Sequence, residues 1–254
     1  MTWAALTGFL LLTGMAAYVQ TLTGFAFGLI TMGGVGLTGL ISLPDAAMLV
    51  SVLALVNATQ MLLKGWREVD WRKFALAQLG SWPCLFIGFH LLGWLAESRA
   101  DLLRLILGCV IILSSLQLAG RPESLRQPSG PASFLFFGGV GGLMSGMFSA
   151  GGPPLVYHFY RQPMSLVVVR ETLVAIFALN SLFRTGLVVA TDQIPPVSTL
   201  SGLFAIPAVM VGTHLARRYP PPISRAVMRR VVFALLFLSG VSLGAPAVIH
   251  LTGL

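Results

Sequence analysis

Long apolar stretches alternate with short polar connections along the whole chain of 254 residues. An α-helix needs about 20 apolar residues to cross a hydrocarbon core roughly 30 Å thick. Because the stretches recur from end to end, the pattern predicts an all-α, polytopic helical membrane protein. The predicted apolar segments are 3–41, 44–64, 73–95, 101–119, 131–160, 166–190, 197–216 and 226–250.

Two of these segments, 3–41 and 131–160, are too long for a single crossing. The second contains Ser-Ala-Gly-Gly-Pro-Pro at 149–154, and the first aligns with it through Gln-Thr-Leu-Thr-Gly-Phe at 20–25. Proline removes a backbone donor and clashes with the preceding turn, and glycine weakens a helix further. We therefore expect each long segment to form a hairpin or a broken, re-entrant helix pair. Irregular backbone at membrane depth is tolerated only where protein or a wet cavity surrounds it, so the breaks mark the expected site.

Composition supports the membrane assignment, since 9% of the residues are charged and 56% are hydrophobic. The net charge of +8 does not indicate a nucleic-acid partner, because the basic residues flank apolar segments and form no stripe. Cys84 and Cys109 lie inside apolar segments, so we expect neither a disulfide framework nor a metal site, and no cofactor. The common sequence motifs of enzymes are absent, which predicts that the chain is not an enzyme.

The connections between the apolar segments differ in charge. The basic connections are 64–73, 121–126, 161–171 and 217–230, and the near-neutral connections are 97–104 and 191–196. Positively charged loops of membrane proteins stay in the cytoplasm. We therefore expect the basic connections on the cytoplasmic side and the near-neutral ones outside.

The two halves of the chain resemble each other. Pro, Gly, His and Leu recur at one offset between 79–91 and 203–215, and Asn57 pairs with Asn180. Matching loops have opposite charge character, so the pattern predicts two inverted-topology repeats, a plan common among secondary transporters. Each repeat is a broken or re-entrant segment followed by three transmembrane helices. The expected division is an N-terminal repeat at 1–120, a cytoplasmic linker at 121–130 and a C-terminal repeat at 131–254.

Helix ends at the two breaks offer free amides and a partial positive charge, which favour an anion. The alternative is that the small residues there only allow tight helix packing. Asn57 and Asn180 either line the site or form interhelical hydrogen bonds, and Arg184 either attracts the anion or snorkels to the interface. The predicted anion-binding residues are Gln20, Thr21, Thr23, Gly24, Asn57, Ser149, Gly151, Gly152, Asn180 and Arg184.

Four further polar residues have two interpretations each. Arg170 and Glu171 begin a predicted helix, where they either gate the site or anchor the helix at the interface. His90 and His214 lie near helix ends and either couple transport to protons or only pack. Because they lie near opposite membrane surfaces in the predicted topology, they cannot share one metal ion.

Two segments carry a family resemblance. Gln-Thr-Leu-Thr-Gly-Phe-Ala-Phe-Gly at 20–28 and the more specific Gly-Gly-Leu-Met-Ser-Gly-Met-Phe-Ser-Ala-Gly-Gly-Pro-Pro-Leu at 141–155 resemble the sulfite exporter TauE/SafE family, also described as toluene sulfonate uptake permeases. The likeness extends over essentially the whole chain, although the first break lacks the Gly-Gly-Pro sequence of the second. The resemblance implies a multi-pass permease of the bacterial inner membrane for anions such as sulfite or sulfonates, with the direction of transport left open.

The expected function is therefore secondary transport of a small sulfur-containing anion by alternating access, with a midplane site at the broken helices. The membrane potential or a proton gradient would drive it. A passive anion channel and a non-transport membrane scaffold are the alternatives. The expected partners are the anionic substrate and the lipid bilayer, while proton coupling and a homodimer stay open.

Overall fold

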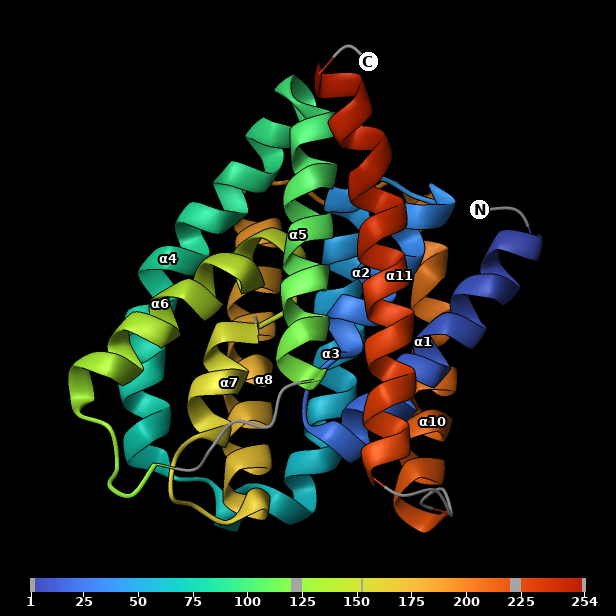
Figure 1. Cartoon of the computed structure of the whole chain (residues 1–254). Coiled ribbons are helices and arrows are strands. Elements are labelled where there is room, and N and C mark those ends of the chain that lie inside the picture. Colours follow the sequence, from blue (N-terminus) through green and yellow to red (C-terminus); the bar gives the residue numbers. More distant parts are fainter. Residues whose placement is uncertain (1–2, 120–124, 152, 220–224, 253–254) are drawn as a thin grey trace.

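Helices make up nearly all of the computed structural model, which describes residues 3–119, 125–151, 153–219 and 225–252 (Figure 1). Seven helical segments in this part of the chain are long and apolar enough to cross a membrane, which confirms the predicted polytopic all-α class. The elements are α1 Trp3–Thr23, α2 Phe27–Thr38, α3 Leu43–Gly65, the short η1 Trp66–Glu68, α4 Trp71–Ser98, α5 Ala100–Ala119, α6 Pro131–Phe148, α7 Pro153–Tyr160, α8 Leu166–Ala190, α9 Val197–Leu200, η2 Ser201–Ala205, α10 Ile206–Arg218 and α11 Arg225–Thr252.

Both long apolar segments are broken, as predicted. The second break follows Phe148, where the sequence pattern placed it. The first lies later than expected, because α1 continues to Thr23 and only 24–26 leave the helix. The hydroxyls of Thr21 and Thr23 each bond to a carbonyl one turn earlier, which is compatible with helix. Gly24 then turns away with φ +83°. Gln20, Thr21 and Thr23 therefore belong to the end of a helix and not to the irregular segment.

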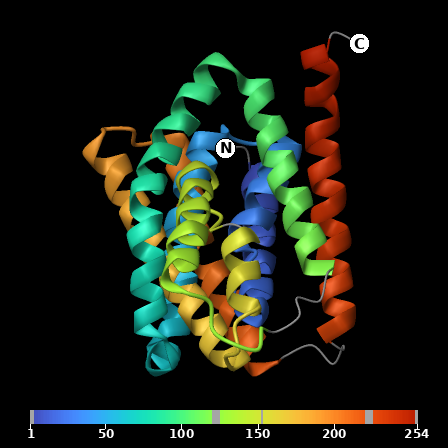
Figure 2. The ribbon, with the colours of Figure 1, turned by 60° about the vertical axis from the view of Figure 1, so that its left-hand side comes forward.

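The two broken segments form hairpins that enter the bundle from opposite ends. In Figure 1, α1 descends and α2 rises, whereas α6 rises and α7 descends. Successive helices alternate in direction throughout, so α3 and α8 run oppositely, as do α4 and α10. The last helices of the two halves, α5 and α11, lie side by side in both views (Figures 1 and 2). The other extensive helix contacts join α4 to α6, α1 to α10 and α3 to α8.

The basic connections gather at one end of the bundle. Arg217 at the end of α10 donates to the carbonyl oxygens of Gln60 and Met61 near the end of α3. The amide of Leu125 donates to the carbonyl of Arg161, which brings the connection before α6 against the one after α7. The near-neutral connections, between α4 and α5 and between α8 and α9, lie at the opposite end in Figure 1. This arrangement agrees with the distribution of positive charge along the sequence.

Glycines allow the helix backbones to meet. Gly138, Gly142 and Gly146, spaced four apart in α6, face successive turns of α4, and a Cβ atom on any of them would lie 2.2 Å from a carbonyl oxygen of that helix. Small residues at such spacing are how membrane helices obtain close packing, because lipid tails supply no hydrophobic drive between helices. The pair α4–α6 therefore depends on the absence of side chains at these positions.

We expect Gly142→Ala to destabilise the folded protein by about 1–3 kcal/mol, because the added methyl group overlaps the backbone of Ser81. The control is Gly93→Ala in α4, where an added Cβ meets nothing within 4 Å. Thermal unfolding in detergent measures both. Equal melting temperatures of the two variants would contradict the packing argument.

The topology predicts opposite accessibility for two exposed glutamines. In a background without Cys84 and Cys109, a cysteine at Gln127 should react with an impermeant maleimide only from the cytoplasm, and one at Gln193 only from outside. Labelling of intact cells and of inverted vesicles measures this. Reaction of both positions from the same side would overturn the topology.

Candidate functional site at the two helix breaks

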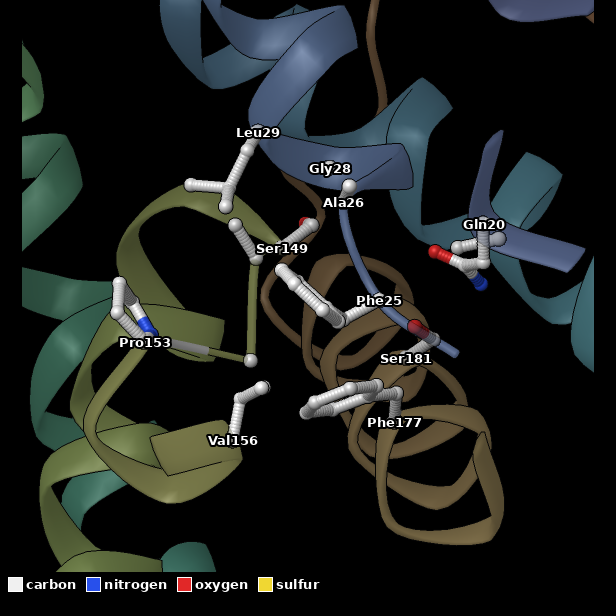
Figure 3. A pocket seen from close by; sticks show the side chains of 13 residues that line it. Gln20, Phe25, Ala26, Gly28, Leu29, Ser149, Pro153, Val156, Phe177 and Ser181 are labelled. Atoms are coloured by element: carbon white, nitrogen blue, oxygen red, sulfur yellow. The ribbon is translucent and has the colours of Figure 1, made fainter. Parts of the chain in front are cut away.

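The two breaks touch each other inside the bundle. A Cβ atom on Gly28, in the first turn of α2, would lie 2.5 Å from the carbonyl oxygen of Ser149 and 2.9 Å from the Cα atom of Ala150. A small cavity opens beside this contact, with a free volume of about 400 Å³ that includes the space at its mouth (Figure 3). It is lined by Gln20, Phe25, Ala26, Gly28, Leu29, Ala54, Ser149, Ala150, Gly151, Pro153, Val156, Phe177 and Ser181.

The side chain of Gln20 holds the first break together. Its Oε1 accepts a hydrogen bond from the amide of Phe27 at 2.9 Å, so it caps the start of α2. Its Nε2 donates to Oδ1 of Asn57, also at 2.9 Å. A helix start leaves its first amides without acceptors in the helix, and Gln20 satisfies one of them from the preceding helix. Gly28 and Leu29, in the first turn of the same helix, line the cavity.

Tertiary contacts maintain the unusual backbone of this break. Ala26 adopts φ +93°, which is costly for a residue with a side chain. A Cβ atom on Gly24 would lie 2.7 Å from Cγ of Arg170, so only glycine fits against that side chain. The hydroxyl of Tyr160, from α7, donates to the carbonyl of Thr23 at 2.8 Å. Residues from the second half of the chain therefore help to shape the first break.

The second break is tied to α3 through hydroxyl groups. Ser149 ends α6 in the left-handed conformation with φ +52°. Its Oγ lies 2.5 Å from the carbonyl oxygen of Ala47 and 2.7 Å from Oγ of Ser51. These contacts engage the Ser149 hydroxyl, so a ligand at this position has to replace one of them.

Arg184 lies behind the second break and is buried, with an exposed fraction of 2%. Its Nε donates to the carbonyl of Gly146 in the last turn of α6 at 2.9 Å, and Nη1 donates to Ser51 at 3.3 Å. The guanidinium also lies over the ring of Phe89, 5.5 Å from its centre. The carbonyl end of a helix carries a partial negative charge, which compensates a cation there. The Arg184 side chain therefore points into the bundle and does not snorkel to the interface.

The two asparagines form hydrogen bonds between helices. Nδ2 of Asn57 donates to the hydroxyl of Thr213 in α10 at 2.6 Å and to that of Thr21 in α1 at 3.2 Å. Asn180 accepts from Ser81 in α4 at 3.1 Å and donates to Ser145 in α6 at 3.3 Å. Neither asparagine lines the cavity. This geometry favours the interhelical interpretation of both residues.

The structure brings Gln20, Ser149 and Gly151 to the cavity among the predicted site residues. The hydroxyls of Thr21 and Thr23 bond to carbonyl oxygens of α1, that of Thr21 also accepts from Asn57, and that of Thr23 also lies 2.7 Å from the carbonyl oxygen of Phe25. Gly24 packs against Arg170. Gly152 lies outside the described residues. The other predicted residues, Asn57, Asn180 and Arg184, support the walls from behind.

Ser181 is the polar cavity residue that the sequence pattern did not single out. Its side chain is buried, with an exposed fraction of 6%, and its hydroxyl forms no hydrogen bond in the described part of the chain. Its oxygen is visible beside Phe25 in Figure 3. The available signal was its spacing from Arg184, which Ser181 precedes by about one turn of the same helix.

The remaining polar candidates lie away from the cavity lining. Arg170 donates from Nε and Nη2 to Oε1 of Glu171, whose side chain is buried. His90 and His214 are exposed on the outside of the bundle. Among the described residues, no three His, Cys, Asp or Glu side chains gather where they could hold a metal ion.

Comparison with known proteins identifies the family. The sequence pattern described as "Sulfite exporter TauE/SafE" matches residues 9–243, which is most of the chain. The chain belongs to the sulfite exporter TauE/SafE family. As a member of this family it is a membrane transporter and not an enzyme.

Two known proteins are similar to this chain. The chain is 40% identical over 243 residues to the "Probable sulfite/organosulfonate exporter TauE" of Cupriavidus necator, covering 96% of this chain and 95% of that protein. It is 25% identical over 200 residues to the "Probable inner membrane transporter protein TsaS" of Comamonas testosteroni, covering 76% and 81%. No solved structure matches the fold.

We expect Asn57→Leu to lower the free energy of unfolding by about 1–3 kcal/mol, because bonds to α1 and α10 are lost and Nε2 of Gln20 loses its acceptor. Thr59→Val is the matched control, since its exposed hydroxyl bonds only to its own helix. Thermal unfolding in detergent compares the two. If both variants melt like the wild type, Asn57 does not join the helices.

Proposed function

We propose that this chain is a secondary transporter that exports sulfite or a small organosulfonate across the bacterial inner membrane. The observation that carries the proposal is the contact between the two helix breaks, with a cavity beside it that polar groups line. The printed names of the two relatives, a sulfite/organosulfonate exporter and an inner membrane transporter, support the substrate class and the location.

The lining of the cavity suits a sulfur oxyanion. The hydroxyl of Ser181 has no acceptor among the described residues. Gly28 and Leu29 also line the cavity and belong to the first turn of α2, where a helix carries a partial positive charge. No acidic side chain is among the described residues that line it. A sulfite or sulfonate group presents three oxygens, and these distributed donors match it better than a single cation would.

The buried charge of Arg184 adds to this preference. It reaches the cavity through a chain of hydrogen bonds, from Nη1 to Ser51 and from Ser51 to Ser149. The carbonyl end of α6 compensates part of this charge, and no carboxylate among the described residues forms a salt bridge with Arg184. The remaining positive charge favours an anion in the cavity.

Alternating access by two inverted repeats is part of the proposal. It is supported by the hairpins that enter from opposite ends and by the reciprocal packing, in which α1 contacts α10 as α6 contacts α4. The repeats would comprise 1–120 and 131–254, joined by a cytoplasmic linker at 121–130. Rocking of one repeat against the other would expose the cavity at the breaks to each side in turn.

Export of an anion agrees with the direction of the membrane potential. A cell interior that is negative favours the exit of each negative charge by about 2.3 kcal/mol per 100 mV. The potential alone can therefore drive export, and the proposal requires no ATP and no bound cofactor.

Counterflow of labelled sulfite would distinguish this carrier from a passive channel.

We expect Ser181→Ala to reduce sulfite transport at low concentration by about tenfold or more, because a hydrogen bond to a charged group is lost. The matched control is Ser114→Ala in α5, where the buried hydroxyl bonds to the carbonyl of Val110 in its own helix. Initial rates in proteoliposomes measure both variants. Equal rates would remove Ser181 from the site, and a wild-type protein that moves no sulfur anion would reject the proposed substrate class.

A further inference from the structure

The ring of Phe177 occupies the side of the cavity next to the second break. A Cβ atom on Gly151 would lie 1.8 Å from Cε1 and 2.0 Å from Cδ1 of this ring. The ring therefore rests directly against bare backbone, and it projects toward Val156 and the interior of the cavity in Figure 3.

Little room is left in the cavity beside this ring. The free volume of about 400 Å³ includes the space at the mouth, so the enclosed part is smaller. A compact anion fits this space more easily than a sulfonate with a bulky organic group. Such a group would have to enter the volume that Phe177 fills.

One helix carries both the donor and the ring. Phe177 and Ser181 are separated by one turn of α8 and therefore lie on the same face. An anion that accepts a hydrogen bond from Ser181 consequently has its remaining bulk next to Phe177. The ring makes no hydrogen bond that its removal would leave unsatisfied, so its truncation changes mainly the available space.

We propose that Phe177 limits the size of the transported anion, so that compact anions such as sulfite pass and sulfonates with a bulky organic group are rejected. This inference rests on the proposed function, because it concerns the same cavity. It assigns substrate selection to an apolar ring beside a glycine and not to the polar residues that bind the oxygens.

The test compares the fluxes of sulfite and benzenesulfonate in proteoliposomes for the wild type, Phe177→Ala and Phe177→Leu. We expect the benzenesulfonate-to-sulfite flux ratio to rise by about tenfold or more in Phe177→Ala, and by less in Phe177→Leu, since discrimination by pocket size is of this order. Phe183→Ala is the control, because Phe183 lies in the same helix but stacks on Trp82, with ring centres 5.6 Å apart. Its ratio should equal that of the wild type.

An unchanged ratio in the Phe177 variants, with sulfite flux retained, would overturn the inference and leave the proposed function intact. An equal rise in Phe183→Ala would also overturn it, because the effect would then be general loosening. If Phe177→Ala does not reach the membrane, Phe177→Leu decides by the same criterion. A wild-type protein that moves neither anion would overturn both proposals.

Discussion

Main-chain groups at membrane depth need hydrogen-bond partners, and at both helix breaks side chains supply some of them. The carbonyl of Thr23 at the first break accepts from Tyr160, which belongs to the second hairpin. The Ser149 side chain at the second break bonds to Ala47 and Ser51 in α3. These contacts tie each break to the opposite half of the chain. The cavity lies where the two breaks meet.

The two breaks solve the same problem with different chemistry. At the first, a neutral amide, Gln20, caps the start of the following helix. At the second, a cation, Arg184, caps the end of the preceding helix. A neutral cap leaves the positive end of α2 uncompensated toward the cavity, whereas the cation neutralises the negative end of α6. Both differences favour an anion between the start of α2 and the end of α6. The two halves therefore differ in the way that anion binding requires.

Close backbone packing makes this arrangement possible. Gly142 brings α6 against α4, and Gly28 brings α2 against the second break, each at a distance that a side chain would prevent. Proline has different consequences in the two halves, since Pro83 lies within the continuous helix α4 whereas Pro207 stands at the start of α10, after a short 3₁₀ turn. The local sequence is similar at the two positions, and the surrounding helices determine whether the helix continues.

The sequence alone determined the membrane class, the approximate spans and the existence of two breaks, because apolar length and the effects of proline and glycine act locally. It located the first break a few residues early, since the hydroxyls of Thr21 and Thr23 bond equally well within a helix and the left-handed turn at Gly24 depends on packing against Arg170. Only the tertiary structure separated Ser181, which lines the cavity, from its neighbour Asn180, which bonds to Ser81 and Ser145. Adjacent residues on a helix point in different directions, and what each one meets is decided by segments far away in the chain.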